Sequence, residues 1–186
     1  MRTRALLKYI PIEYHHSIYE VDFNKFKSMG YGTLFFDLDN TIADYYTHSP
    51  SEEAIKLFEH LKEIGFNCFI LSNNKEKRIK KFEDELKIKG YYSLRKPFTR
   101  RIKKYILDDS IDVSKVLWVG DQAVTDVRCA YKLNIKTILL DPINPGSEHW
   151  YTKVNRFIEK RIFMQIKKKL NSVYSSLGLE KRYDRY

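Results

Sequence analysis

Acidic residues follow predicted strands at two places that lie far apart in the sequence. Asp37 and Asp39 come directly after the apolar run TLFF, and Asp121 follows the run VLWVG, with Asp126 five residues further on. Carboxylates gathered in one place repel each other unless a cation binds between them. Oxygen ligands favour a hard divalent ion, most simply Mg²⁺. The pattern therefore predicts a magnesium site among these carboxylates.

Other polar residues suit the binding and cleavage of a phosphate ester. Ser72 and Asn73 follow the apolar run FNCFIL, and Lys96 stands just before Pro97. A phosphate monoester carries about two negative charges, so a divalent ion and Lys96 are both needed to hold it beside an attacking carboxylate. A carboxylate can attack phosphorus to give an aspartyl-phosphate that water then hydrolyses. A second group must protonate the leaving alkoxide and later deprotonate the water, and Asp39 is the candidate.

The hydrophobic pattern indicates which elements position these side chains. Apolar runs predict strands at residues 33–37, 66–71, 115–119 and 137–140. Helical patterns separate them: one after the capping box Ser49-Pro50-Ser51-Glu52 with Pro50 at its first position, a basic one over 75–88, one beginning at Pro97, and one over 123–133. This alternation predicts an α/β fold with a central parallel sheet. Ligands of such sheets bind at the carboxyl ends of the strands.

Each predicted helix has an apolar face that should point toward the sheet. The expected inward residues are Ala54, Leu57, Phe58, Leu61 and Ile64 in the first helix, Ile79, Phe82 and Leu86 in the second, and Phe98, Ile102, Tyr105 and Ile106 in the third.

Four blocks of the sequence, taken in order, resemble the haloacid dehalogenase (HAD) superfamily of phosphatases. They are Asp37-Leu38-Asp39-Asn40-Thr41, Ser72-Asn73, Lys96-Pro97 and Gly120-Asp121-Gln122 with Asp126. The resemblance implies that Asp37 is the nucleophile and a Mg²⁺ ligand, and that Asp39 is the acid/base and binds the metal through its backbone carbonyl. It implies phosphate binding by Thr41, Ser72, Asn73 and Lys96, and a metal site completed by Asp121, with Asp126 as a ligand or a support. The acid at position 39 is the phosphatase form of the first block, since ATPases of the superfamily carry Thr there.

The resemblance narrows to the YqeG-type branch of the HAD-IIIA phosphatases and covers roughly residues 6–170. It rests on the segment from Ile12 to Ile18, on SNN before a basic helix, on RKP, on GDQ-x-x-TDV, and on Thr152, Asn155-Arg156 and Glu159 near the end. It implies a HAD-like Rossmannoid three-layer sandwich. We expect an N-terminal extension at 1–30 that packs on the core, a phosphatase core at 31–147, and a basic amphipathic helix and tail at 148–186.

The chain has little room for the cap domain that covers many HAD active sites. Seven residues separate Thr41 from Ser49, and 22 separate Asn73 from Lys96. We therefore expect no large cap. An open site excludes water poorly unless the substrate or a partner closes it. This favours a large substrate, namely a lipid headgroup, a protein or a nucleic-acid end. A small soluble phosphate ester is the alternative if a neighbouring subunit of an oligomer acts as the lid.

Positive charge is concentrated at the C-terminal end. The formal net charge is +10, and residues 150–186 hold ten basic and three acidic residues. Residues 148–170 place Trp150, Tyr151, Val154, Phe157, Ile158, Ile162, Ile166 and Leu170 at helical spacing among lysines and arginines. Such a helix can lie at a membrane interface, or its apolar stripe can pack on the sheet domain. A mixed arrangement would pack Trp150–Ile158 and leave the later residues at the interface.

Several classes of protein and site are excluded. The chain lacks an apolar run of the ~20 residues that a membrane span needs, and its N-terminal apolar run is too short for a secretory signal. Cys68 and Cys129 are too few for a disulfide framework, so we expect buried, reduced thiols in a cytosolic protein. His15 and His16 are adjacent and lack Cys/His partners, so we do not expect a metal site there.

The substrate is the least determined part of the sequence analysis. The YqeG-type branch resembles the fungal and plant mitochondrial-type phosphatidylglycerophosphate phosphatases, which implies removal of the terminal phosphate of that anionic lipid. We expect a cytoplasmic enzyme whose basic C-terminal helix can contact the inner face of the membrane. The alternatives are a nucleic-acid end phosphatase, in which the basic helix and tail follow a phosphate backbone, and a phosphatase of a small soluble or protein substrate. A binding protein on a degenerate HAD fold is disfavoured because Asp37, Asp39, Lys96 and Asp121 are all present.

Overall fold

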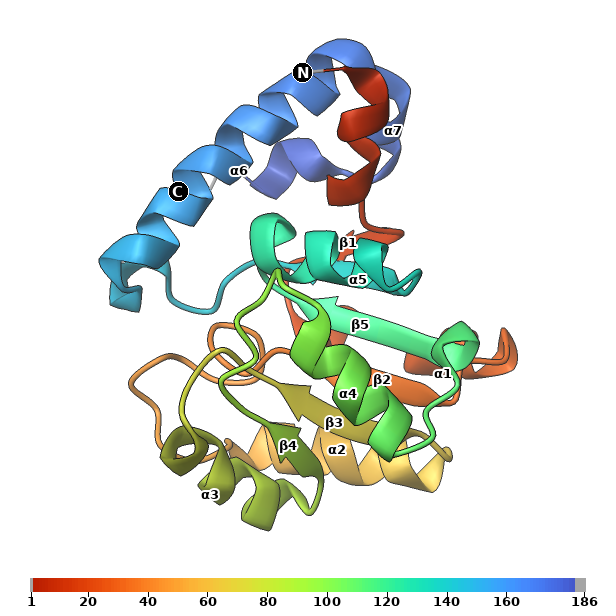
Figure 1. The fold of residues 1–186 in the computed structure, drawn as a ribbon, viewed down its shortest axis with the longest axis vertical. Coiled ribbons are helices and arrows are strands. Elements are labelled where there is room, and N and C mark those ends of the chain that lie inside the picture. Colours follow the sequence, from red (N-terminus) through yellow and green to blue (C-terminus); the bar gives the residue numbers. More distant parts are fainter. Residues whose placement is uncertain (1, 183–186) are drawn as a thin grey trace.

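The fold is built on a central sheet of six parallel strands with helices on both faces (Figure 1). The computed structural model describes residues 2–182. The strand order is β1-β6-β5-β2-β3-β4. The strands are β1 (Glu13–His15), β2 (Thr33–Phe36), β3 (Asn67–Leu71), β4 (Lys89–Tyr91), β5 (Val116–Gly120) and β6 (Lys136–Leu140). The four predicted strands are confirmed, with ends that differ by one residue.

Side chains alternate between the two faces of each strand, so a single strand serves two apolar layers. Leu34 and Phe36 of β2 face α1 (Phe23–Ser28), α2 (Glu52–Glu63) and α3 (Glu76–Leu86). Phe35 faces the opposite layer, made by α4 (Arg100–Asp108) and α5 (Arg128–Lys132). The prediction of a three-layer α/β fold is confirmed.

Two details of the predicted helices are wrong. The N-cap of α2 is Ser51, whose hydroxyl accepts from Ala54 N at 3.1 Å, rather than Ser49, so Pro50 precedes the helix. Helix α4 begins at Arg100 rather than Pro97, and Phe98 lies in the preceding loop with 70% of its surface exposed instead of pointing inward. The apolar spacing continued upstream of the true helix start, where no turn of helix forms to direct the side chain.

The N-terminal segment adds an edge to the sheet. Strand β1 pairs in parallel with β6, with Tyr14 beside Leu139. Before it, the 3₁₀ turn Leu7–Tyr9 buries Tyr9, and Leu6 beside it is fully buried. The N-terminal part of the chain is therefore integral to the sheet and its packing.

The C-terminal segment forms a further packed unit outside α5. Helix α6 (Trp150–Lys169) is followed by α7 (Asn171–Ser176) and the 3₁₀ turn Leu179–Arg182. The second half of α6 buries Ile162, Phe163 and Ile166 in a third apolar cluster that also contains Leu6, Tyr9, Val127, Leu139, Tyr174 and Leu179. The first half leaves Trp150, Tyr151, Val154, Phe157 and Ile158 exposed. The predicted mixed arrangement packed Trp150–Ile158 and is therefore wrong about which half of α6 is packed. The second half is buried instead, because only this half contacts the N-terminal turns and α7.

No cap domain covers the sheet edge in the described residues 2–182. A short loop connects Thr41 to α2, and α3 with β4 fills the chain between Asn73 and Lys96. Among these same residues, no helix combines the length and apolar character needed to cross a membrane.

Candidate active site

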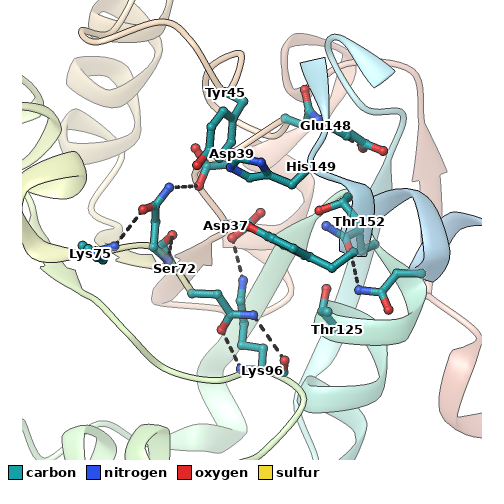
Figure 2. Close-up of a pocket in the computed structure, with 16 residues that line it drawn as sticks. Asp37, Asp39, Tyr45, Ser72, Lys75, Lys96, Thr125, Glu148, His149 and Thr152 are labelled. Carbon is teal, nitrogen blue, oxygen red and sulfur yellow. Dashed lines mark hydrogen bonds and ion pairs between the residues drawn. The ribbon is translucent and has the colours of Figure 1, made fainter. Parts of the chain in front are cut away.

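A pocket of about 470 Å³ lies at the carboxyl ends of the strands (Figure 2). Asp37 and Asp39 follow β2, Ser72 and Asn73 follow β3, and Gln122 follows β5. All of them line this pocket together with Lys96. The other lining residues are Asn40, Tyr45, Asn74, Lys75, Thr125, Glu148, His149, Tyr151, Thr152 and Asn155. The pocket thus gathers residues from all four sequence blocks, although the predicted Asp121 and Asp126 of the fourth block are not among its lining residues.

Lys96 joins two carboxylates at the base of the pocket. Its Nζ lies 2.6 Å from Asp37 Oδ1 (Figure 2). The same Nζ lies 2.7 Å from Asp126 Oδ1, and the ammonium is almost fully buried. Burial lowers the pKa of Lys96, but Asp126 and Asp37 outweigh burial and raise it above the ordinary value. Burial raises the pKa of Asp37 well above its usual range, and Lys96 counteracts that rise. Lys96 therefore helps to keep Asp37 in the anionic form that a nucleophile needs.

Three carboxylates could hold a metal ion. Oxygens of Asp37, Asp121 and Asp126 lie within 4.8 Å of one another, and all three residues are buried. Asp121 Oδ1 is buried and has no hydrogen-bond partner in the described part of the chain. Burial raises the pKa of Asp121 to about 6, against the opposing charge of Arg156. An oxygen-only set with one unpartnered, buried carboxylate atom fits a hard divalent cation. The carboxylate of Asp39 is outside this set.

The backbone around β5 allows Asp126 to reach the cluster. A π-helical turn over Ala123–Val127 carries Asp126 back toward the strand, and Gln122 N donates to Asp126 Oδ2 at 3.2 Å. A Cβ on Gly120 would lie 2.6 Å from Asp126 Cγ, so only glycine fits there. π-Helical turns are rare and often occur at functional sites. The predicted helix over 123–133 is confirmed only as this turn followed by α5.

Asp39 is held on the opposite side of the pocket by α3 and the loop before it. Arg78 donates through Nε to Asp39 Oδ1 at 3.1 Å, and Asn74 Nδ2 donates to Oδ2 at 3.3 Å. The same guanidinium donates to the backbone carbonyls of Asp44 (2.9 Å) and Thr47. Arg78 therefore fixes both the candidate acid/base and the short loop beside it.

The predicted phosphate-binding residues differ in whether their polar atoms are available to bind a ligand. Ser72 Oγ accepts from Asn74 N at 3.0 Å, which leaves its hydroxyl hydrogen available to a ligand. Asn73 is already used, because its Oδ1 accepts from Lys96 N at 2.6 Å and its Nδ2 donates to Lys96 O at 3.2 Å. Thr41 is buried and is not among the residues that line the pocket, and its hydroxyl has no partner within residues 2–182.

Support for Asp121 comes from the C-terminal segment. Arg156 of α6 donates to Asp121 O at 2.7 Å, to the Asp121 carboxylate, and to Glu148 Oε1 at 2.6 Å. Glu148 also accepts from Asn40 Nδ2 at 3.1 Å. The fully buried Arg182 donates to Asp121 O at 2.6 Å and to Glu159 Oε1 at 2.8 Å. The segment after β6 thus forms one wall of the candidate site.

Aromatic rings surround the mouth of the pocket. His149 lies between Tyr45 and Tyr151, with ring centroids 4.4 Å and 5.2 Å away. Tyr45 comes from the loop before α2, and His149 is the loop residue that precedes α6 (Figure 2). Tyr151 lies in the first turn of α6. These contacts narrow the entrance without a cap domain.

Several of these contacts were not identified from the sequence. Arg78 lies in a helix whose many charges gave no sign that one of them points into the site. Tyr45, Glu148 and His149 belong to loops with no pattern of their own. Arg156 appeared only within the resemblance, without a role. For Arg156, the available signal in the sequence was its spacing of seven residues from His149, which corresponds to two turns of α6.

The comparison with known families settles the classification. The family model of haloacid dehalogenase-like hydrolases matches residues 7–140. The chain belongs to the haloacid dehalogenase-like hydrolase family. Among curated relatives, this HAD-like hydrolase is 30% identical over 161 residues to the "Probable phosphatase YqeG" of Bacillus subtilis strain 168, covering 87% of this chain and 93% of the relative. The resemblance to the YqeG type is therefore confirmed, and the chain is a HAD-family phosphatase.

Two solved structures were compared with this HAD-like hydrolase, and the fold likeness rests on the first of them. A protein of Porphyromonas gingivalis, described as a predicted HAD-like family hydrolase, is 14% identical with a TM-score of 0.51, covering 69% of this chain and 98% of that one. An uncharacterized protein of Listeria monocytogenes serotype 4b is 19% identical with a TM-score of 0.49, covering 62% and 80%.

Proposed function

We propose that this HAD-family phosphatase is a Mg²⁺-dependent phosphomonoester hydrolase that works through an aspartyl-phosphate on Asp37. The observation that carries the proposal is the placement of Asp37 at the base of the pocket. Its carboxylate is 2.6 Å from Lys96 and shares a cluster with Asp121 and Asp126. This arrangement supplies a nucleophile together with positive charge for a phosphate dianion.

The proposed reaction has two steps, and Asp39 serves both. An Asp37 carboxylate oxygen attacks phosphorus, the bond from phosphorus to the ester oxygen breaks, and Asp39 gives its proton to the departing alkoxide. Asp39 then takes a proton from water as the water oxygen attacks phosphorus, and the bond to Asp37 breaks to release inorganic phosphate. Arg78 and Asn74 hold Asp39 near the pocket wall before the substrate binds.

Lys96 and the metal ion would together neutralise the negative charge of the bound phosphate. Lys96 faces Asp37 directly and would pair with a bound phosphate oxygen, while the Ser72 hydroxyl would donate to another. Asp37, Asp121 and Asp126 would hold Mg²⁺, with the Asp39 backbone carbonyl as a further ligand. The bound ion would neutralise phosphate charge and offset the repulsion between carboxylates.

We propose the terminal phosphate of phosphatidylglycerophosphate as the substrate, and a cytoplasmic location that includes contact with the inner face of the membrane. Support comes from the kinship with the YqeG type, from a site that no domain among residues 2–182 covers, and from the positive charge of residues 150–182. The pocket of about 470 Å³ would hold a phosphorylated headgroup and leave the rest of a large substrate outside.

The test is phosphate release from phosphatidylglycerophosphate in mixed micelles, beside a soluble aryl phosphate and a 3′-phosphorylated oligonucleotide. Each substrate is measured with Mg²⁺ and with EDTA, and Asp37→Asn serves as the blank. We expect Mg²⁺-dependent turnover that prefers the lipid and disappears in Asp37→Asn with the fold retained. An active Asp37→Asn enzyme would overturn the mechanism. Turnover of the aryl phosphate or oligonucleotide with the lipid untouched would overturn the substrate.

A further inference from the structure

Helix α6 exposes an apolar stripe that lies mostly in its first half. Trp150, Val154, Phe157, Ile158 and Met164 recur at helical spacing and are all exposed, Trp150 by 76% and Phe157 by 57%. We call these five residues the α6 stripe. The same helix buries Ile162, Phe163 and Ile166 on its opposite side. Contiguous exposed apolar residues on a helix typically mark an interaction surface.

The charges beside the α6 stripe have one sign. Lys153, Lys160 and Arg161 are exposed in this part of the helix, and residues 167–169 add three exposed lysines at its end. Glu159 is the one acidic residue of Trp150–Lys169, all of which the structure describes, and it is buried against Arg182. The exposed side of α6 is thus apolar and cationic, which complements a surface that is apolar and anionic.

A shallow groove runs beside the α6 stripe. Pro142, Pro145 and Phe157 give it an apolar lining, and Lys153, Arg156 and Lys160 border it. Two carboxylates also line it, but both are buried in ion pairs, Glu148 with Arg156 and Glu159 with Arg182. Its volume is about 280 Å³. The Arg161 guanidinium lies 4.5 Å from the Phe157 ring centroid. Apolar floors with cationic borders suit molecules that present hydrocarbon beneath phosphate groups.

The α6 stripe is continuous with the active-site mouth. Tyr151, next to Trp150, lines the pocket that contains Asp37. Helix α6 begins on the side of the sheet toward which the arrowheads of β3 and β5 point (Figure 1). A planar surface resting on the first half of α6 would therefore lie beside the pocket entrance.

We propose that the α6 stripe, with Lys153, Lys160 and Arg161, docks this enzyme onto the surface of an anionic lipid bilayer. The helix lies in the interface with its apolar residues among the acyl chains and its lysines at the phosphates. A nucleic acid fits less well because three of the five residues of the α6 stripe are aliphatic and offer no ring for base stacking, which leaves only Trp150 and Phe157 for that role. The inference concerns binding and does not depend on which ester the site hydrolyses.

The two tryptophans provide a direct readout. Trp118 is fully buried, whereas Trp150 is exposed. Vesicles of phosphatidylglycerol and phosphatidylcholine are added to the full-length protein, and emission and co-sedimentation are recorded. We expect a blue shift that is absent in Trp150→Phe, quenching by lipids brominated on their acyl chains, and at least tenfold weaker binding to pure phosphatidylcholine vesicles.

Matched variants separate the α6 stripe from general surface effects. Phe157→Ser with Ile158→Ser, and separately Lys153→Glu with Lys160→Glu, should each weaken binding at least tenfold. The controls Leu107→Ser and Lys104→Glu change exposed residues of α4 and should leave binding unchanged. Circular dichroism and thermal unfolding verify the fold of each variant.

The outcomes are distinct from those of the activity test. Absence of binding to anionic vesicles, or equal loss in the α4 controls, would overturn the docking surface even if the enzyme hydrolyses phosphate esters. Tighter, variant-sensitive binding to an RNA oligonucleotide or to an acidic protein, with vesicles ignored, would also overturn it. Vesicle binding by a protein that turns over none of the phosphate esters would leave the docking surface intact and overturn the proposed function alone.

Discussion

Arg156 of α6 donates to the backbone carbonyl of Asp121 at 2.7 Å and also to the carboxylate of the same residue. The guanidinium is thereby shared between a candidate metal ligand and Glu148. The support of the site thus comes from a helix outside the sheet. Deletion of all residues after Asp141 would remove the α6 stripe, but it would also remove Arg156 and Arg182, which support the candidate site. Point variants are therefore the appropriate way to separate membrane docking from catalysis.

Arg156→Ala should destabilise the protein strongly. The substitution leaves Asp121 and Glu148 as buried carboxylates without this cation. Removing one partner of a buried ion pair costs about 3–5 kcal/mol. Urea unfolding would measure the change, with Lys160→Ala as the control on the exposed side of the same helix. A loss no larger than that of the control would show that Arg156 supports neither residue.

Divalent cations should stabilise the folded protein. Mg²⁺ binding to the cluster of Asp37, Asp121 and Asp126 adds about 2.7 kcal/mol at a free concentration 100 times the Kd. Thermal unfolding with Mg²⁺ and with EDTA should show a higher Tm with the ion. Asp126→Asn should lose most of this difference, and Asp108→Asn, which changes an exposed acid on α4, should retain it. An equal response of both variants would contradict the site.

Asp39→Asn should separate the two halves of the reaction. A nitrophenyl phosphate has a leaving group that needs little protonation, so formation of the aspartyl-phosphate should survive while its hydrolysis slows by about 10²- to 10⁴-fold. Rapid mixing should therefore show a burst of nitrophenolate equal to the enzyme concentration, followed by slow turnover. An alkyl phosphate should give no burst of the released alcohol, because its leaving group needs the proton that Asp39 supplies. Unchanged steady-state rates would exclude Asp39 as the acid/base.

Arg78→Gln should reduce turnover although Arg78 lies at the side of the pocket. The variant releases both Asp39 and the carbonyls of Asp44 and Thr47. We expect kcat to fall about tenfold or more, as misplacement of a catalytic group does, with a smaller change in KM. Lys77→Gln changes the exposed neighbour on α3 and should have wild-type kinetics. Equal kinetics for the two variants would contradict a positioning role for Arg78.

Both cysteines should be unreactive in the native protein. Burial raises the pKa of Cys68 and of Cys129 to about 12. The reactive thiolate forms only as the pH approaches this value, so at pH 8 roughly one thiol in ten thousand is ionised. An aromatic disulfide reagent should titrate no thiol until urea unfolds the protein, and then two. Fast labelling of the native protein at pH 8 would contradict the burial of these thiols.

The strands and most of the site could be predicted because one physical rule governs both. A strand covered on both faces is a continuous apolar run, so the first polar residue after it marks the ligand edge of the sheet. Asp37, Ser72 and Asp121 all stand at such positions. Lys96 follows no strand, and it was included because a phosphate dianion beside a carboxylate needs a further cation and because the resemblance gave it that role.

The exposure of the first half of α6 and the role of Arg78 could not be predicted from the sequence. Both depend on which elements contact each other in the folded protein. The apolar periodicity of α6 extends over both halves, yet only the second half contacts the N-terminal turns and α7, so Trp150 is exposed and Ile162 is buried. Arg78 has the same charge and helix as Lys77, and only the position of α3 against the loop after β2 distinguishes them. The spacing of apolar residues indicates which side chains share a face of a helix, but it does not indicate which element covers that face.

The third apolar cluster also constrains the kinetics of folding. Leu6 and Tyr9 near one end of the chain pack with Phe163 and Leu179 near the other, so this cluster closes a loop of almost the full chain length. Contacts of high sequence separation form slowly, because the entropy of loop closure is lost before they contribute. The sheet around Trp118 can form before this closure, whereas Arg156 and Arg182 reach Asp121 only with it. Refolding should therefore restore the environment of Trp118 first and catalytic competence in a later phase.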